Sequence, residues 1–342
     1  MVFDKHFQLP MVQQGSFGLE REVGAGITAS ATYVMNTDRQ LPNSVDINIA
    51  PSMGMGVFQL QGGPINGSGP LGVTTGETFV VPVYTARVST NYGPVTDILS
   101  NTNATYNGLV LEARRRSRRG LEFRANWTWA KAIDYGQNNG AVPRTNGQFD
   151  PFTIRYDRGL STLNVAHKIT ATAVWQPTVV MPERWMRTAA NGWSIALVFT
   201  VQSGRPYSYE IFGGTRLSGG HESINGSGGA VYLPTIGRNT LRLPETANLD
   251  LKLSRTIRLG ENVRVRAAAE IFNVQNRVNY TSITTRAYLV GTAVNGVTPL
   301  IFQDAATVAT EGLNVQPFGT YMAASSNSSR ERQVQIGFKV EF

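Results

Sequence analysis

The chain has 342 residues and no cysteine, which excludes disulfide bonds and thiolate metal sites. Its net charge of +8 admits anionic partners, but charged residues form only 16% of the chain, a low share for a soluble globular domain. No long uninterrupted apolar run is present, so the sequence predicts no membrane-spanning helix. A transmembrane barrel stays possible, because only alternate residues of its strands meet lipid.

Apolar and polar residues alternate along nine stretches of the sequence. In LEFRANWTWA, for example, Leu121, Phe123 and Ala125 share a face with two tryptophans, and polar residues lie between them. A period of two over such lengths is typical of half-buried antiparallel strands. We therefore predict strands at residues 11–22, 26–36, 105–117, 121–134, 163–177, 192–203, 247–258, 262–275 and 330–342.

The connections between these strands alternate in length. Tight turns are predicted at 22–26, 116–120 and 259–262, and long segments rich in glycine and asparagine at 37–104, 135–162, 204–246 and 276–329. The shorter connection at 178–191 has room for a helical turn. A transmembrane barrel explains the alternation, since its short turns face the periplasm and its long loops face outside. The predicted fold class is all-β, an antiparallel transmembrane β-barrel portion of about nine to ten strands.

Several stretches carry a family resemblance. The motif E-x-F-N-x-x-N is formed by Glu270, Phe272, Asn273 and Asn276, and a last strand ending in phenylalanine follows it. Other matching stretches are GLVLEARRRSRRGLEFRANWTWAKAIDYGQNN, TNGQFDPFTIRYDRGLSTLNVAHKITATAVWQP, VQSGRPYS and, near the start, VQQGSFGLEREVGAGITASATYV with RQLPNSVDINIAP. Together they resemble the C-terminal barrel of Oar-like TonB-dependent outer-membrane receptors, with acidobacterial members as the nearest parallels.

The resemblance implies a barrel of about 22 strands with a plug in its lumen. It also implies a signal peptide, a periplasmic N-terminal domain and a TonB-contacting segment. The N-terminal MVFDKHFQLP has no apolar region typical of a signal peptide. Residues 1–342 are therefore expected to be an N-terminally truncated, C-terminal part of the barrel, with no plug, signal peptide or periplasmic domain.

The function implied by the resemblance is energised transport of an unidentified extracellular ligand across the outer membrane. The implied partners are outer-membrane lipid, the barrel-assembly machinery and, through the missing N-terminal parts, the TonB complex. Two other hypotheses stay open: an adhesin-like structural barrel whose loops bind surfaces, and a soluble all-β binding protein whose apolar faces bury one another.

Four groups of residues are candidate sites. Polar positions predicted to line the lumen are Glu122, Arg124, Asp250, Lys252, Arg264, Arg266 and Glu270. Candidates in an extracellular loop are Phe149, Asp150, Phe152, Arg155, Tyr156 and Asp157. Candidates for interfacial aromatic girdles are Trp127, Trp129, Trp175 and Trp193. The last strand has an apolar face formed by Val334, Ile336, Phe338, Val340 and Phe342, which the resemblance implies is an assembly signal.

Two of these groups also have a purely structural interpretation. The loop GQFDPFTIRYDRG either contacts a solute or calcium, or is held together by its own ion pairs and aromatic packing. The lumen charges either meet the plug or pair across strands. We expect such pairing where Arg264 and Arg266 approach Asp250 and Lys252 in one hairpin.

The other motifs favour no catalytic or nucleic-acid role. The arginine run from Arg114 to Arg119 lies at a predicted turn, where alternation sends neighbouring side chains to opposite faces. The histidines have no metal-ligand spacing, and no G-x-S-x-G elbow occurs. The glycine pattern at 67–72 lacks a βαβ context. We therefore expect no enzyme activity, no cofactor, no metal site and no nucleic-acid partner.

We predict that the barrel-assembly machinery reads the last strand. Deleting Phe342 from a full-length homologue should lower its level in the outer membrane and increase periplasmic degradation. Immunoblots of fractionated cells measure both quantities. Unchanged abundance in the membrane would refute this prediction.

Overall fold

The computed structural model describes residues 1–52, 54–63, 75–118, 120–136, 146–215, 217, 222–259, 263–312, 315–323 and 331–342. The glycine pattern at 67–72, His221 and most of the turn at 259–262 lie outside these residues. Most of the regular structure is β-strand. Within the described ranges, no helix combines the length and apolar character needed to cross a membrane.

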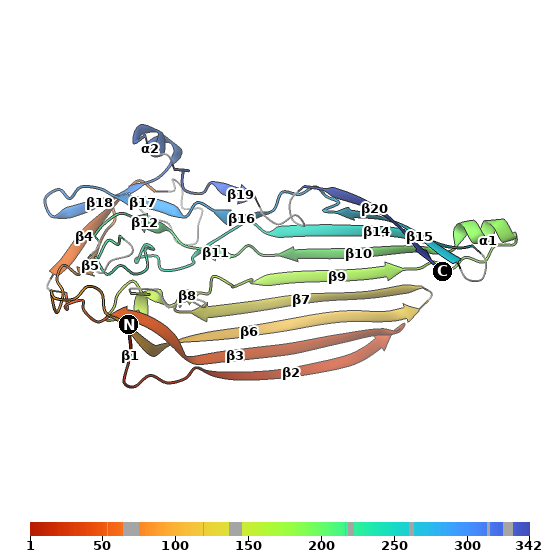
Figure 1. Ribbon diagram of the computed structural model, residues 1–342, viewed down its shortest axis with the longest axis horizontal. Helices are drawn as coiled ribbons and strands as arrows, with labels where there is room; N and C mark the ends of the chain where they lie inside the picture. The colour runs from red at the N-terminus through yellow and green to blue at the C-terminus, as the bar shows by residue number, and fades with distance from the viewer. Residues whose placement is uncertain are drawn as a thin grey trace.

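Nine long antiparallel strands follow one another in a single sheet over the described residues, in the order of the sequence. They are β2 (Met11–Gly24), β3 (Ile27–Asp46), β6 (Thr96–Arg118), β7 (Leu121–Asp134), β9 (His167–Trp175), β10 (Trp193–Gln202), β14 (Thr246–Leu259), β15 (Val263–Phe272) and β20 (Gln333–Glu341). Two short strands, β1 (Val2–Phe3) and β8 (Gly159–Leu160), pair with β6 and β7. Figure 1 shows the long strands side by side, with short connections at one end and the long segments gathered at the other. The all-β prediction is confirmed.

Two strands extend far beyond their predicted ends. β3 continues to Asp46 and β6 begins at Thr96, and the two stay paired over this extension. The register shifts on both sides of Leu41, and Gln40 has a positive φ of 56°. Such bulges let an irregular, polar stretch containing Pro42 continue as a strand. The sequence prediction stopped early because this stretch has no clean alternation.

The register places the apolar residues of neighbouring strands in common rows. One row across five strands contains Leu19, Ala31, Leu111, Trp127 and Ile169. Antiparallel pairing keeps such residues on one face of the sheet. Leu19, Leu111, Trp127 and Ile169 are exposed. An apolar sheet face without a protein layer against it fits contact with lipid and does not fit a soluble sandwich.

The sheet is open in the part of the chain that the structure describes. β2 pairs there with β3 and β20 pairs with β15, and these two strands form the ends of the sheet. An open strand edge leaves N–H and C=O groups that hydrocarbon cannot satisfy. These edges must therefore find hydrogen-bonding partners in a membrane.

The long segments are not irregular loops. Three of them contribute strands to a second sheet, called the loop sheet, in the order β12-β17-β18-β4-β5. Its strands are β4 (Gly54–Gln61), β5 (Thr78–Val83), β12 (Glu210–Phe212), β17 (Arg286–Val290) and β18 (Val297–Phe302). The parallel pairs β12–β17 and β4–β18 join strands from different segments.

Smaller elements complete the two ends of the molecule. They are η1 (Ile154–Asp157), α1 (Arg184–Ala190), α2 (Ala305–Thr310) and the strand pairs β11 (Pro206–Tyr207) with β13 (Leu241–Arg242) and β16 (Tyr280–Ile283) with β19 (Tyr321–Ala323). The Asp304 side chain accepts a hydrogen bond from the Thr307 amide at 2.8 Å and so caps α2. Helix α1 confirms the helical turn expected at 178–191.

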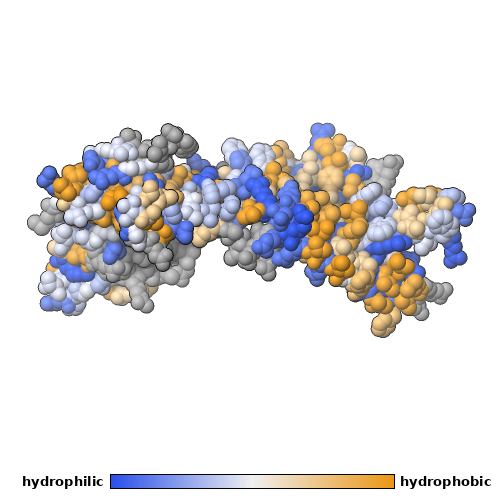
Figure 2. All heavy atoms as spheres, turned by 90° about the horizontal axis from the view of Figure 1, so that it is seen from above, coloured by the Kyte–Doolittle hydropathy of each residue, from blue (hydrophilic) through white to orange (hydrophobic). Residues whose placement is uncertain are grey.

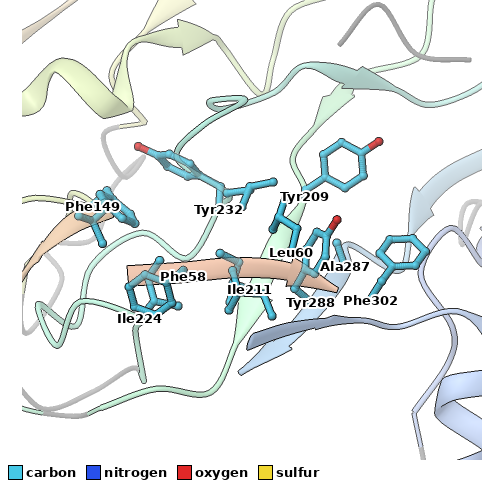
Figure 3. Packing of buried hydrophobic residues seen from close by; sticks show 13 residues of the cluster. Phe58, Leu60, Phe149, Tyr209, Ile211, Ile224, Tyr232, Ala287, Tyr288 and Phe302 are labelled. Atoms are coloured by element: carbon cyan, nitrogen blue, oxygen red, sulfur yellow. The ribbon is translucent and has the colours of Figure 1, made fainter. Parts of the chain in front are cut away.

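The long segments share one hydrophobic core, called the loop core (Figure 3). Leu60, Ile211 and Leu300 are completely or almost completely buried in it. Phe149 brings in the remaining long segment, between β7 and β9, and its ring lies 5.8 Å from that of Tyr232. The four long segments therefore fold as one unit at their end of the strands.

We predict that Leu300→Ala loosens this unit. Removing a fully buried leucine side chain destabilises a core by about 2–5 kcal/mol, through lost apolar burial and the cavity left behind. Hydrogen exchange should speed up in β4, β17 and β18 but not in β7 or β10. Leu9→Ala is the matched control, because Leu9 is 80% exposed. Equal effects of both variants would contradict a shared loop core.

Candidate functional site

The loop between β7 and β9 is organised by two buried carboxylates. The Asp150 carboxylate accepts hydrogen bonds from the Tyr84 hydroxyl at 2.9 Å and from the Phe152 amide at 2.8 Å. The Asp157 carboxylate, at the end of η1, accepts a hydrogen bond from the Phe149 amide at 3.2 Å. Both aspartates are almost inaccessible to solvent. Their side chains therefore hold the loop together.

The segment between β12 and β13 ties this loop down from the other side. The Arg238 guanidinium donates to the backbone carbonyls of Asp157 and Asp134, each at 2.9 Å, and forms an ion pair with the Asp134 carboxylate. Asn225 and Ser227 donate to the Phe149 carbonyl at 2.7 and 3.0 Å. Buried polar groups need such partners. The loop thus belongs to the folded unit of the four long segments.

Other residues of the loop lie at the edge of this network, with the Phe152 ring 5.6 Å from that of Tyr84 and the Tyr156 ring 5.3 Å from that of Phe149. Phe152 is 57% exposed. The Arg155 guanidinium is exposed, lies 4.9 Å from the centre of the Tyr156 ring, and donates to the Tyr156 hydroxyl at 3.0 Å. This pair presents one cation beside an aromatic ring, and Phe152 adds a second ring on the same loop. Phe152, Arg155 and Tyr156 are therefore the members of the predicted group that a solute can reach.

Burial changes the acid–base behaviour of this loop. It raises the pKa of the Asp157 carboxyl to about 6, although Tyr232, the Phe149 amide and Arg238 act in the opposite direction. Burial and the hydrogen bond to Asp150 raise the pKa of the Tyr84 hydroxyl, so Tyr84 remains a hydrogen-bond donor. In the described residues no group of three or more acidic or histidine side chains gathers as metal ligands. The geometry therefore supports a structural network here.

The candidate lumen residues lie on the face opposite Trp127 and Trp175. Glu122, Lys252 and Glu270 occupy one row of that face, because the register aligns them across β7, β9, β10, β14 and β15. Lys252 forms an ion pair with Glu270, and Arg124 pairs with Glu112 at 2.7 Å. These exposed pairs contribute little to stability. They make this face of the wall polar and charged.

The expected pairing of Arg264 and Arg266 with Asp250 is wrong. In the β14–β15 hairpin, Arg264 lies opposite Arg258, and Arg266 lies opposite Thr256 and donates to its hydroxyl at 3.3 Å. Asp250 lies about 20 Å further along the hairpin than Thr256, the partner of Arg266, at about 3.4 Å per residue. The Asp250 carboxylate instead accepts hydrogen bonds from the backbone N–H of Asn273 at 2.9 Å and from the side chain of Asn248 at 2.8 Å. The register of the hairpin, which sequence alone leaves open, decides the pairing.

The four tryptophans lie at two levels of the apolar face. Trp175 pairs with Leu121 at the short-turn end, and Trp193 is close to the same end. Trp129 lies eight residues beyond Leu121 on β7, about 27 Å along the strand. Trp127, Trp129 and Trp175 are exposed, and Trp193 is half-buried beneath the Arg255 guanidinium. A soluble core would bury such side chains.

The apolar residues of the last strand also point outward. Val334, Ile336, Phe338 and Val340 of β20 are exposed, as is Phe342. They continue the rows of the apolar face, since Ile336 pairs with Ala269 and Phe338 with Ala267. Figure 2 shows apolar residues gathered on part of the strand region and polar residues beside them.

Sequence reasoning did not find the residues that tie the loops together. Asn225 and Ser227 lie in a stretch rich in glycine and serine with no periodicity, and neither Tyr84 nor Arg238 belongs to a motif that points to its partner. Their partners are 66 to 104 residues away in the sequence. The alternation in FQLQ and the apolar run LIF were usable signals for β4 and β18, although both stretches are short.

These features together define a class of protein. An antiparallel strand array with an exposed apolar face, a charged opposite face, short turns at one end and long segments at the other is the wall of a transmembrane β-barrel. The sequence model of the outer membrane beta barrel domain matches residues 1–335. The chain therefore belongs to the outer membrane beta barrel domain family, and its location is the cell outer membrane. This excludes the soluble binding protein considered above.

One solved structure shows the same fold. The chain is similar to the outer membrane transporter YddB from Escherichia coli, with 12% identity and a TM-score of 0.50 over 98% of this chain and 33% of that one. It is also similar to the FrpB iron transporter from Neisseria meningitidis, with 10% identity and a TM-score of 0.41 over 100% of this chain and 33% of that one. The chain thus spans about a third of the length of both transporters. The search of curated proteins found no match.

We predict that the stability of the β7–β9 loop depends on pH through Asp157. The Asp157 carboxyl ionises at its ordinary pKa of 3.8 in the unfolded chain and near pH 6 in the folded loop. The folded loop binds more protons in this window, so its stability falls as pH rises from about 4 to about 6 and is then constant. We expect a loss of on the order of 2–3 kcal/mol.

Hydrogen exchange of amides in residues 149–160, corrected for intrinsic rates, measures this change. Asp157→Asn cannot ionise and should remove the pH dependence, whereas amides of β10 provide the internal reference. A pH dependence that persists in Asp157→Asn would contradict the assignment.

Proposed function

We propose that this chain forms part of the barrel wall and the extracellular loops of an Oar-like TonB-dependent receptor, which takes up an unidentified ligand by energised transport. The observation that carries the proposal is the folding of four long segments around one core, at the end of a wall whose inner face is charged. A preorganised loop unit binds a ligand at lower entropic cost than separate mobile loops. It therefore suits capture of a scarce solute.

Each group of residues has a role in this proposal. Phe152, Arg155 and Tyr156 contact ligand on the outside, where a cation and aromatic rings suit an anionic or aromatic solute. The charged lumen face contacts the plug or the passing ligand. Energy arrives from the TonB complex through a plug and TonB-contacting segment, which the resemblance places N-terminal to this part. The chain itself performs no catalysis.

The exposed aromatic rings support further proposals about the membrane. Trp175 and Trp193 lie in the periplasmic interface, and Trp127 and Trp129 toward the outer one. Their spacing matches an apolar band of about 25 Å. The outward residues of β20 and Phe342 are presented to the barrel-assembly machinery during insertion, as the resemblance implies.

Adhesion is the alternative function. Exposed apolar residues on the long segments, such as Val88 and Tyr92 together with Phe152, support binding to a surface. In that case nothing crosses the barrel and no energy source is needed. The two functions therefore differ in their dependence on the proton-motive force.

The test compares solute depletion from the medium by cells with and without the full-length protein, measured by mass spectrometry. Transport predicts at least one solute whose depletion needs the protein and is abolished by a protonophore or by loss of TonB. Phe152→Ala with Arg155→Ala should weaken uptake, because both side chains are exposed where a solute can reach them. The control Leu9→Ala should not. Protein-dependent cell attachment without any depletion would overturn transport and favour adhesion.

A further inference from the structure

We propose that the segment from Val179 to Ala190, at the short-turn end, is a membrane anchor that lies in the periplasmic leaflet of the outer membrane. It connects β9 to β10 and contains α1 (Figure 1). This inference goes beyond the proposed function and holds whether the protein transports or adheres. It rests on how α1 is attached, on which side chains it exposes, and on its charge.

The attachment places α1 against the lipid side of the wall. The Trp193 indole donates to the Ala189 carbonyl at 3.0 Å, and the Arg255 guanidinium donates to the Thr188 carbonyl at 3.0 Å. Trp193 and Arg255 pair across β10 and β14, in the row that continues through Ala267 to Phe338. Phe338 is 76% exposed on the apolar face. The C-terminal end of α1 is therefore fixed to the face of the wall that contacts lipid.

The base of the segment is closed by one side chain. The side-chain amide of Asn191 donates a hydrogen bond to the Val179 carbonyl at 2.9 Å. Its oxygen accepts a hydrogen bond from the backbone N–H of Val179 at 2.7 Å. The same side chain donates to the Arg187 carbonyl at 2.8 Å at the end of α1. These contacts tie the two ends of the segment together. Its position at the rim of the wall is thus defined by specific bonds.

Several apolar side chains of the segment are exposed. None of the residues of α1 is buried. Trp185 is 67% exposed, Val180 is 92% exposed, and Met186 is exposed as well. At about 100° per residue, Trp185, Met186, Ala189 and Ala190 share one side of the helix, and Arg184, Arg187 and Thr188 share the other. A seven-residue helix is marginal alone in water, so a bilayer interface would stabilise it.

The charge of the segment complements phospholipid headgroups. It contains Arg184 and Arg187 against a single acidic residue, Glu183. Arginine binds phosphate through a planar fork of donors, and basic residues near an anionic membrane surface are attracted by about 1 kcal/mol each. The partner is therefore the phospholipid surface, with apolar side chains at the acyl boundary and the arginines at the phosphates.

A fluorescent probe on cysteine tests this location, because the chain contains no natural cysteine. Val180→Cys carries the probe on the segment, and Val88→Cys is the matched control, since Val88 is 68% exposed in a long segment at the opposite end. The full-length protein, with any cysteine outside this chain replaced, is inserted in vesicles of phosphatidylethanolamine and phosphatidylglycerol that contain lipids with shallow nitroxide labels. We expect a blue-shifted, nitroxide-quenched probe at position 180 and a water-like, unquenched probe at position 88.

Two results would overturn the anchor. One is a water-like probe at position 180, and the other is a blue shift without nitroxide quenching, which means burial against protein. The arginines are tested by adding Arg184→Gln and Arg187→Gln to the Val180→Cys variant. Glutamine is a good helix former, so these two substitutions retain the helix propensity of α1. In anionic vesicles the quenching should fall to its level in neutral phosphatidylcholine vesicles. Quenching that stays the same in this variant would contradict headgroup binding by the arginines.

Discussion

The pairing of backbone N–H and C=O groups in a medium without water is the constraint on which this structure depends. Hydrocarbon offers no hydrogen-bond partners, so every segment that crosses it must pair along its length. The nine long strands of the described chain do so in sequence order. The open edges of β2 and β20 are where the same constraint demands hydrogen-bonding partners.

The same pairing decides where chemistry can lie on the molecule. Alternation sends one set of side chains to lipid and leaves the other set to line the interior, so the wall itself has room only for rows of charges such as Lys252 and Glu270. Our proposal therefore assigns specific recognition to the long segments. These segments build a core around Leu60, Ile211 and Leu300, which converts long connections into a rigid unit.

The two ends of the wall use buried and exposed groups in opposite ways. At the loop end, Asp150, Asp157 and Arg238 are buried and hold the backbone of different segments together. At the short-turn end, Trp185 and Val180 are left exposed beside arginines. Buried charges require partners within the protein, whereas exposed apolar groups require partners outside it. In the described residues the first end thus satisfies these charges within the protein, and our proposal makes the second depend on the bilayer.

The sequence by itself determined the strand array and its two faces, because a period of two is a local property that any single strand displays. It also determined the alternation of short and long connections between the strands. It also located the helical turn at 178–191. Only the tertiary structure decided that Lys252 meets Glu270 while Asp250 meets Asn273, since hairpin register sets which side chains are neighbours. Only the tertiary structure joined Phe149 with Asn225, and β4 with β18. Those contacts bring together segments far apart in the sequence, and no local pattern encodes them.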